Sequence, residues 1–396
     1  ISSPSASISH TVCDDASFVV PGCTVASVDW LMSMGLRTVK CIPPKCRLGF
    51  SRIFTGALDA VVSSPDNISC WVRLLLLPLC ILKTFAPRSS LECRAVVKRQ
   101  RQEESIFSAI RTWGEPDGSL QLLRETLAEF SPSFRWDADL DLSEGNIRQC
   151  RRKISDGHYS AAVRVLSSSG VAPYTDSTFE ALQEKHPSVS PPVLPCLSSE
   201  HRPLVVSGAI VLDMIRSFPR GTSCGRDGFR AQHLLDCLSG AAVAVSDEFI
   251  TSCTRVVNLF LEGRCPQVLG EYIASAPLTP LVKPGGGIRP IAVGTVWRRL
   301  VSKVGAFFTG PSLSGYFEGL QFGVGVSGGG EAVLHALNRF VEARGDDVGF
   351  SMLLVDFQNA FNMVDHETML LEVRRQCPVL SRWVEFCYSR PDRLYF

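Results

Sequence analysis

The sequence predicts an α+β fold, in which a mostly helical N-terminal region precedes a region that mixes helices with a few strands. Apolar residues recur with a helical period over 50–63, 70–84 and 144–168, the last being interrupted at Gly157. Residues 274–294 contain two short runs around the turn Pro-Gly-Gly-Gly, which is the pattern of a β-hairpin. Residues 350–355 are mainly apolar and lead to Asp356, which indicates a buried strand that ends in a carboxylate.

A proline-rich stretch at 186–203, with five prolines, predicts the main domain boundary. We therefore expect a helical N-terminal extension over 1–200 and a second domain over 201–396. Thr295 and Asp365 are each placed to cap a following helix. The second domain is expected to contain, in order, helices at 208–218, 230–238 and 247–263, the hairpin, a helix at 295–308, a glycine-rich loop at 320–330, a helix at 331–343, the strand at 350–356, a helix at 366–376 and the start of a strand at 393–396.

The overall charge does not indicate a polyanion-binding protein, because 40 basic residues are balanced by 39 acidic ones. The fifteen cysteines are scattered without a C-x-x-C pair, so we expect reduced thiols in an intracellular compartment, either nucleus or cytoplasm. No signal peptide is visible. The apolar run at 74–82 is too short to span a bilayer, so we expect no membrane contact.

Two local groups of basic residues stand out. Between Tyr272 and Phe317 there are five basic residues and no acidic one, namely Lys283, Arg289, Arg298, Arg299 and Lys303. This cluster supplies a local patch for contacts with phosphates. Farther upstream, Arg148, Arg151, Arg152 and Lys153 form one basic face of a predicted helix, which is either a solvated face or a phosphate-contacting one.

Three kinds of chemistry would place a carboxylate such as Asp356 at the end of a strand. Gly323, Gly325 and Gly328 have the G-x-G-x-x-G spacing of a dinucleotide fold, and Ser327 lies in a G-x-S-x-G motif followed by Asp356 and His366. Both interpretations require a buried strand before the glycines, and residues 315–322 are too polar and glycine-rich for one.

The third interpretation is phosphoryl transfer by two metal ions. A polymerase uses carboxylates to hold two divalent cations about 4 Å apart. Asp356 would be one of these carboxylates, Phe361 could stack beneath the sugar of an incoming nucleotide, and Lys283 and Arg289 flank a hairpin tip from which they could reach its phosphates.

Residues 201–396 resemble the N-terminal half of a reverse transcriptase domain of the non-LTR retrotransposon type, especially the reverse-transcriptase-like proteins of plant genomes. The matching stretches occur in the order of the family: GRDGF before the fingers, LTPLVKPGGGIRPIAV as the fingers hairpin, LVSKV after it, QFGVGVSGGGEAVLHALN before the palm, and LLVDFQNAFNMVDHETML as the first palm motif. The resemblance implies the fingers and part of the palm of a right-hand polymerase fold.

The resemblance also implies roles for single residues. Asp356 would be the first metal-binding, catalytic aspartate, and Phe357 would contribute its backbone carbonyl. Phe361 would be the steric gate, Lys283 and Arg289 would contact the triphosphate, and Gln321 and Gly323 would lie near the nucleotide. The implied cofactor is Mg²⁺ or Mn²⁺, and the implied partners are an RNA template, a DNA primer and deoxynucleoside triphosphates.

The sequence departs from the family pattern in two ways. Asn362 stands where many relatives have Asp, and neither the glycine-glutamine turn nor the aromatic-x-Asp-Asp hairpin of the later palm motifs follows the first one. A single aspartate cannot hold two hard cations, which need several oxygen ligands. We therefore expect a family fragment, truncated after the first palm motif, that is catalytically incomplete. The alternatives are a non-catalytic protein of retroelement origin that binds nucleic acid or another partner, and a translated remnant without a selected role.

Overall fold

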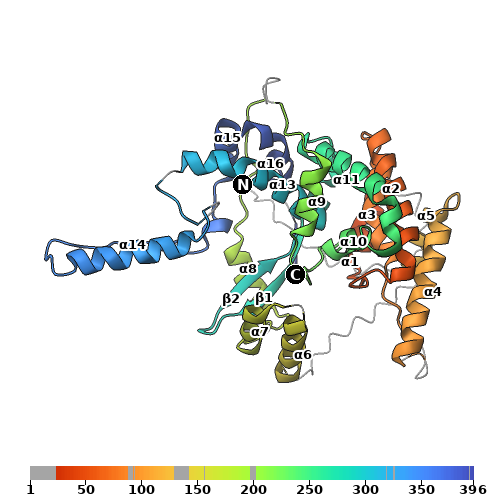
Figure 1. Ribbon diagram of the computed structural model, residues 1–396, viewed down its shortest axis with the longest axis horizontal. Helices are drawn as coiled ribbons and strands as arrows, with labels where there is room; N and C mark the ends of the chain where they lie inside the picture. The colour runs from red at the N-terminus through yellow and green to blue at the C-terminus, as the bar shows by residue number, and fades with distance from the viewer. Residues whose placement is uncertain are drawn as a thin grey trace, which may run out of the picture.

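The computed structural model describes residues 24–87, 92, 94–128, 142–155, 157–196, 202–317, 319–323, 326–391 and 393–396 (Figure 1). Within this part the chain is mostly helical and carries one small mixed sheet, so the predicted α+β class is confirmed. The right-hand arrangement of a polymerase stays a prediction. None of the described helices combines the length and apolar character that crossing a bilayer requires.

The helices predicted near the N-terminus are present. The elements before residue 129 are α1 (Val25–Ser33), the 3₁₀ turn η1 (Pro44–Cys46), α2 (Arg47–Ser63), α3 (Ile68–Ile81), α4 (Ala95–Trp113) and α5 (Gly118–Ala128). The Asn67 side chain caps α3 by accepting a hydrogen bond from the Ser69 N–H at 3.0 Å. The side chains from Leu74 to Ile81 are buried, so the apolar run belongs to the core, as predicted.

The next helices lead into the predicted boundary. They are α6 (Leu142–Ser155), α7 (Tyr159–Leu166) and α8 (Asp176–Lys185). Gly157, with φ of +80°, separates α6 from α7, which confirms the predicted break because glycine adopts positive φ without strain. Residues 187–196 and 202–207 contain neither helix nor strand, and the boundary itself stays a prediction.

The elements of the C-terminal half follow the predicted order up to α14. They are α9 (Gly208–Arg216), α10 (Ala231–Asp236), η2 (Gly240–Val245), α11 (Ser246–Leu261), η3 (Gln267–Leu269), α12 (Gly270–Ala274), β1 (Ala276–Val282), β2 (Ile288–Ala292), α13 (Val296–Tyr316), α14 (Gly329–Arg344), η4 (Ala360–Asn362), α15 (His366–Gln376), η5 (Pro378–Leu380), α16 (Ser381–Tyr388) and β3 (Leu394–Tyr395). Both predicted caps are confirmed, because Thr295 and Asp365 accept hydrogen bonds from the N–H groups of Arg298 and Thr368.

The sheet has the strand order β2-β1-β3. β1 and β2 are antiparallel with Leu281 opposite Arg289, and β1 and β3 are parallel with Ala276 opposite Leu394. Near the hairpin tip, residues 170–172 of the N-terminal half pair with the other edge of β1. The Ala172 N–H donates to the Pro280 carbonyl at 2.8 Å, and the Val282 N–H donates to the Gly170 carbonyl at 3.1 Å. The sheet is therefore completed by a segment from the other side of the predicted boundary.

One hydrophobic core contains residues from both halves of the chain. The Phe54 ring of α2 lies 5.2 Å from the Phe229 ring and 6.3 Å from the Trp297 ring, measured between centroids. Polar contacts cross the same junction: the Ile42 N–H donates to the Asp236 carboxylate at 2.6 Å, and Arg47 forms an ion pair with it at 2.9 Å. Helices α1 to α3 are thus packed into the fold of residues 202–396 rather than lying beside it.

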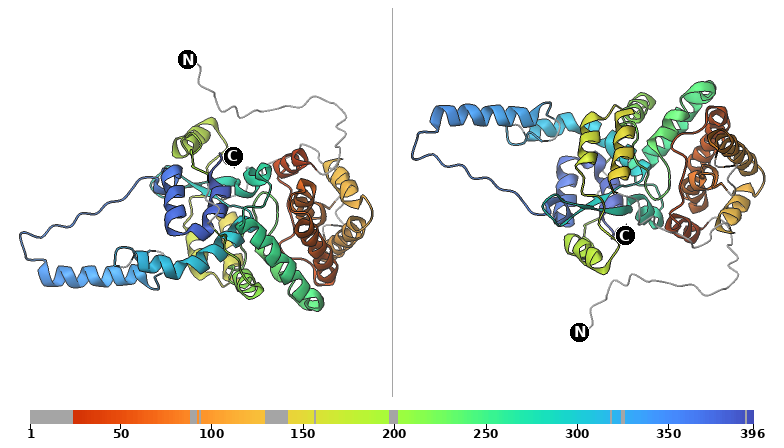
Figure 2. Two further views of the ribbon diagram at one scale, coloured as in Figure 1. Left: turned by 90° about the horizontal axis from the view of Figure 1, so that it is seen from above. Right: turned by 90° about the horizontal axis from the view of Figure 1, so that it is seen from below.

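The predicted strand at 350–356 is wrong. Residues 350–357 form neither helix nor strand, and Leu353 and Leu354 are 88% and 79% exposed. A strand needs a hydrogen-bonded neighbour, and no described residue pairs with this backbone. Figure 2 shows α14 and the extended segment after it projecting from the rest of the molecule. We call residues 329–358 the arm.

Candidate functional site

The β1–β2 hairpin presents two of the predicted nucleotide-binding cations to solvent. Lys283 begins the turn and Arg289 lies on β2, and both side chains are exposed. The turn is closed by hydrogen bonds from the Lys283 N–H to the Gly287 carbonyl and from the Gly286 N–H to the Lys283 carbonyl. Gly286 and Gly287 have φ of +86° and +78°, with open space around them, so the turn needs glycine for its backbone conformation alone.

The other three cations of the predicted patch make contacts within the protein. Arg298 donates to the Ala274 carbonyl and lies over the Tyr388 ring, and Arg299 donates to the Ser223 carbonyl at 2.6 Å. Lys303 donates to the Ser217 carbonyl at 3.0 Å. All three side chains are half-buried. Their binding to nucleic acid stays a prediction, and the contacts that the structure shows fix the start of α13.

Asp356 lies at the end of the arm, and its side chain is exposed. Phe357 and Phe361 are 75% and 95% exposed, so neither ring is packed against the protein. The turn after Asp356 is held from the N-terminal half, because the Asn359 and Asn362 side-chain amides both donate to the Lys185 carbonyl, at 2.6 and 3.1 Å. Asn359 adopts a left-handed conformation with φ of +58°, which asparagine tolerates better than most residues.

The described residues do not fit a two-metal site. Within the described ranges, no group of three or more His, Cys, Asp or Glu side chains is arranged to hold a metal ion. A pair of Mg²⁺ or Mn²⁺ ions needs several protein oxygens, and Asp356 supplies one exposed carboxylate. Asp356 by itself therefore does not provide the ligands that a pair of these ions needs.

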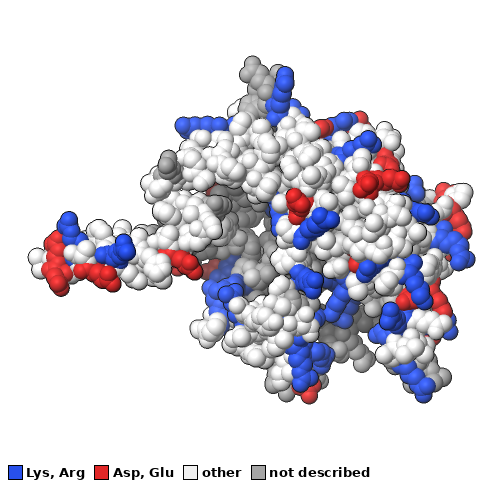
Figure 3. Space-filling view, viewed as in Figure 1, with Lys and Arg blue, Asp and Glu red and all other residues white. Residues whose placement is uncertain are grey.

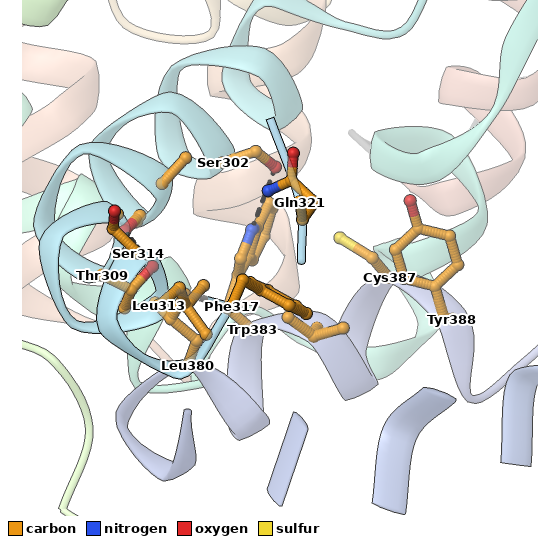
Figure 4. A pocket seen from close by; sticks show the side chains of 14 residues that line it. Ser302, Thr309, Leu313, Ser314, Phe317, Gln321, Leu380, Trp383, Cys387 and Tyr388 are labelled. Atoms are coloured by element: carbon orange, nitrogen blue, oxygen red, sulfur yellow. Dashed lines mark hydrogen bonds between the residues drawn. The ribbon is translucent and has the colours of Figure 1, made fainter. Parts of the chain in front are cut away.

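Gln321 borders a cavity of about 250 Å³ between α13 and α16 (Figure 4). The lining is mainly apolar and includes Leu313, Phe317 and Trp383, and the Trp383 indole N–H donates to the Ser302 hydroxyl at 3.2 Å. Gly323 is exposed on the loop that follows, two residues along the chain. The structure thus separates Gln321, at an apolar cavity, from the solvent-facing tip of the hairpin.

The GRDGF turn holds a buried carboxylate for which the sequence analysis predicted no role. Asp227 is 1% exposed, its Oδ1 accepts a hydrogen bond from the Phe229 N–H at 3.2 Å, and its Oδ2 has no partner among the described residues. Burial raises the pKa of Asp227 to about 7. Asp227 is thus a buried polar group whose ionisation is coupled to folding.

His233 follows this turn on α10. Its Nε2 donates to the Val39 carbonyl at 2.8 Å, which leaves Nδ1 to accept the Arg230 N–H at 3.3 Å. Burial lowers the pKa of His233 to about 4, so the neutral imidazole is the form that fits. The glycines of the GRDGF turn were the sequence feature that could have indicated this close packing. A Cβ on Gly228 would lie 2.6 Å from Thr38, a residue of the N-terminal half.

The comparisons with known proteins point to a retroelement. No protein-family model matches the chain. A stretch of 155 residues is 26% identical to the retrotransposable element SLACS 132 kDa protein of Trypanosoma brucei gambiense. The match covers 39% of this chain and 12% of that protein, so the chain spans about an eighth of the relative's length. The similarity supports a relationship to retroelement proteins.

Proposed function

We propose that the chain is a retroelement-derived protein of the reverse transcriptase type, which binds RNA through its fingers hairpin and does not polymerise nucleotides by itself. The observation that carries the proposal is the hairpin, whose exposed Lys283 and Arg289 flank an open glycine turn. The similarity to the trypanosome retrotransposon protein and the order of the family-like motifs support it. An RNA template, a DNA primer and deoxynucleoside triphosphates are the partners that the proposal names, with Mg²⁺ or Mn²⁺ as the cofactor of the complete family enzyme.

The first test is the binding of a short fluorescein-labelled single-stranded RNA, followed by anisotropy at several salt concentrations. Each phosphate contact contributes about 0.7 to the slope of log K against log salt for a single strand, so Lys283→Gln/Arg289→Gln is expected to reduce the slope by roughly 1.4. Affinity should fall together with the slope. Arg298, Arg299 and Lys303 are left intact, because their side chains also support the fold.

The matched control is Lys98→Gln/Arg111→Gln on α4, which removes the same net charge from exposed positions. If the control weakens RNA binding as much as the hairpin variant does, the binding depends on the overall charge of the protein and not on the position of the cations. The hairpin would then not be the binding site.

The second test is primer extension on an RNA template with Mg²⁺ or Mn²⁺. We expect no incorporation, because the described residues provide no cluster of three or more metal-binding side chains around Asp356. Asp356→Asn serves as the control. Incorporation by the unmodified chain that disappears in this variant would contradict the proposed lack of activity and would support the polymerase interpretation directly.

A further inference from the structure

The helix pair α6–α7 carries positive charge that nearby carboxylates do not compensate. Residues 142–170 contain five Arg and Lys residues and two acidic residues. Arg148, Arg151 and Arg152 are exposed at helical spacing, and none has an ion-pair partner among the described residues. On α4, by contrast, Arg99 and Arg101 pair with Glu103 and Glu104. The α6 cations are therefore available to an external anion.

This helix pair is joined directly to the hairpin. The backbone of residues 170–172, just after α7, pairs with the last residues of β1, and Val171 lies opposite Leu281. The Asn146 side chain donates to the Ser168 carbonyl at 3.1 Å, which ties α6 to the same connection. Figure 3 shows Lys and Arg side chains over both the hairpin and the α6–α7 pair. The two basic groups are thus carried by segments that the backbone pairing at 170–172 holds together.

An exposed aromatic residue accompanies the cations. Tyr159, the first residue of α7, is 68% exposed, although Ala162, about one turn farther along the helix, is buried. Tyr159 follows the end of α6 that carries Arg151 and Arg152, after the connection at 156–158. Single-stranded nucleic acids bind surfaces that combine exposed rings, on which bases stack, with cations that contact phosphates.

We propose that Arg148, Arg151, Arg152 and Tyr159 form a second RNA-binding surface, which extends the hairpin surface onto the N-terminal half of the chain. Its ligand is single-stranded RNA, whose phosphates contact α6 and whose bases stack on Tyr159. This second surface rests on the proposed function, in which RNA is the ligand of the hairpin. The RNA-bound strand would run from the hairpin tip across the strand pairing at 170–172 to α6.

The test uses the full chain and the same labelled RNA. Arg148→Gln/Arg151→Gln/Arg152→Gln is expected to lower affinity at least about tenfold near 0.1 M salt and to reduce the salt slope by roughly 2, for three phosphate contacts to a single strand. Tyr159→Ala is expected to lower affinity about tenfold without changing the slope, because stacking involves no counterion release. Tyr159→Phe keeps the ring and should bind as the unmodified chain does.

The control is Lys98→Gln/Arg111→Gln/Arg124→Gln, which removes three exposed charges from α4 and α5. If the α6 variant behaves like this control while the hairpin variant loses affinity, the second surface is overturned and the proposed function stands. If the RNA affinity of neither variant falls below that of its control, both proposals fail. Loss of binding to anionic lipid vesicles in the α6 variant, with RNA binding unchanged, would assign the surface to membranes and would also overturn the inference.

Discussion

Replacing Phe54 with Ala is expected to lower the free energy of unfolding by about 3–5 kcal/mol, as for other buried Phe to Ala changes. Phe54 is 1% exposed, and its ring contacts Phe50, Phe229, Phe249 and Trp297. Partners from α2, α11 and α13 would all border the cavity that the change leaves. A loss of this size is a large part of the total stability of an ordinary domain.

The measurement is urea unfolding followed by tryptophan fluorescence, with Phe107→Ala on α4 as the control. Phe107 is 41% exposed, so its removal should cost far less than the loss of a buried ring. The core contains tryptophans from both halves, Trp71 and Trp113 on one side of the predicted boundary and Trp297 and Trp383 on the other, so the fluorescence reports on both. We expect a single transition that shifts as a whole. Two separate transitions, of which the Phe54 change moves only one, would show that the N-terminal half folds alone.

Sequence reasoning succeeded where the determinants are local. The hairpin was predictable because glycines supply the backbone conformations of its turn, two of them, Gly286 and Gly287, at positive φ. The starts of α13 and α15 were predictable because Thr295 and Asp365 cap them through their own side chains. Each of these signals lies within a few residues of the feature that it determines. No distant contact is needed to interpret them.

Sequence reasoning failed where the determinants are distant. Residues 350–356 have the composition of a strand, yet strand formation depends on a neighbouring backbone that the segment itself does not encode. The basic run from Lys283 to Lys303 looked uniform, but the carbonyls of Ala274, Ser223 and Ser217 divide it into solvent-facing and structural cations. The burial of Asp227 depends in the same way on Thr38 and Leu79, which approach the neighbouring Gly228 from the N-terminal half.

Asp227 and His233 are expected to make the free energy of unfolding depend on pH in opposite directions. The pKa of Asp227 rises from 3.8 to about 7 on folding, so the folded state keeps a proton that the unfolded state has lost. Stability from this group is present below pH 3.8 and is lost as the pH rises toward 7, by roughly 4 kcal/mol at 1.36 kcal/mol per pKa unit. The pKa of His233 falls from 6.5 to about 4. Its contribution is present above pH 6.5 and is lost as the pH falls toward 4, by roughly 3 kcal/mol.

Between about pH 4 and 6.5 the two slopes oppose each other, so each group is measured by the difference in stability between the unmodified chain and the variant that lacks that group. The stability of Asp227→Asn relative to the unmodified chain should therefore rise by roughly 4 kcal/mol from pH 4 to pH 7, because asparagine cannot ionise while its Oδ1 can still accept the Phe229 N–H. The relative stability of His233→Gln should change in the other direction, rising as the pH falls from 6.5 to 4.

Urea unfolding at a series of pH values measures both differences, and Asp213→Asn, at an exposed position of α9, reports the effect of losing a carboxylate at the surface. Flat difference curves for both variants would show that neither group changes its pKa on folding. His233 donates its hydrogen bond to Val39, and Thr38 lies beside Gly228; both residues belong to the N-terminal half. The opposite slopes would therefore also show that α1 to α3 remain packed on the GRDGF turn in solution.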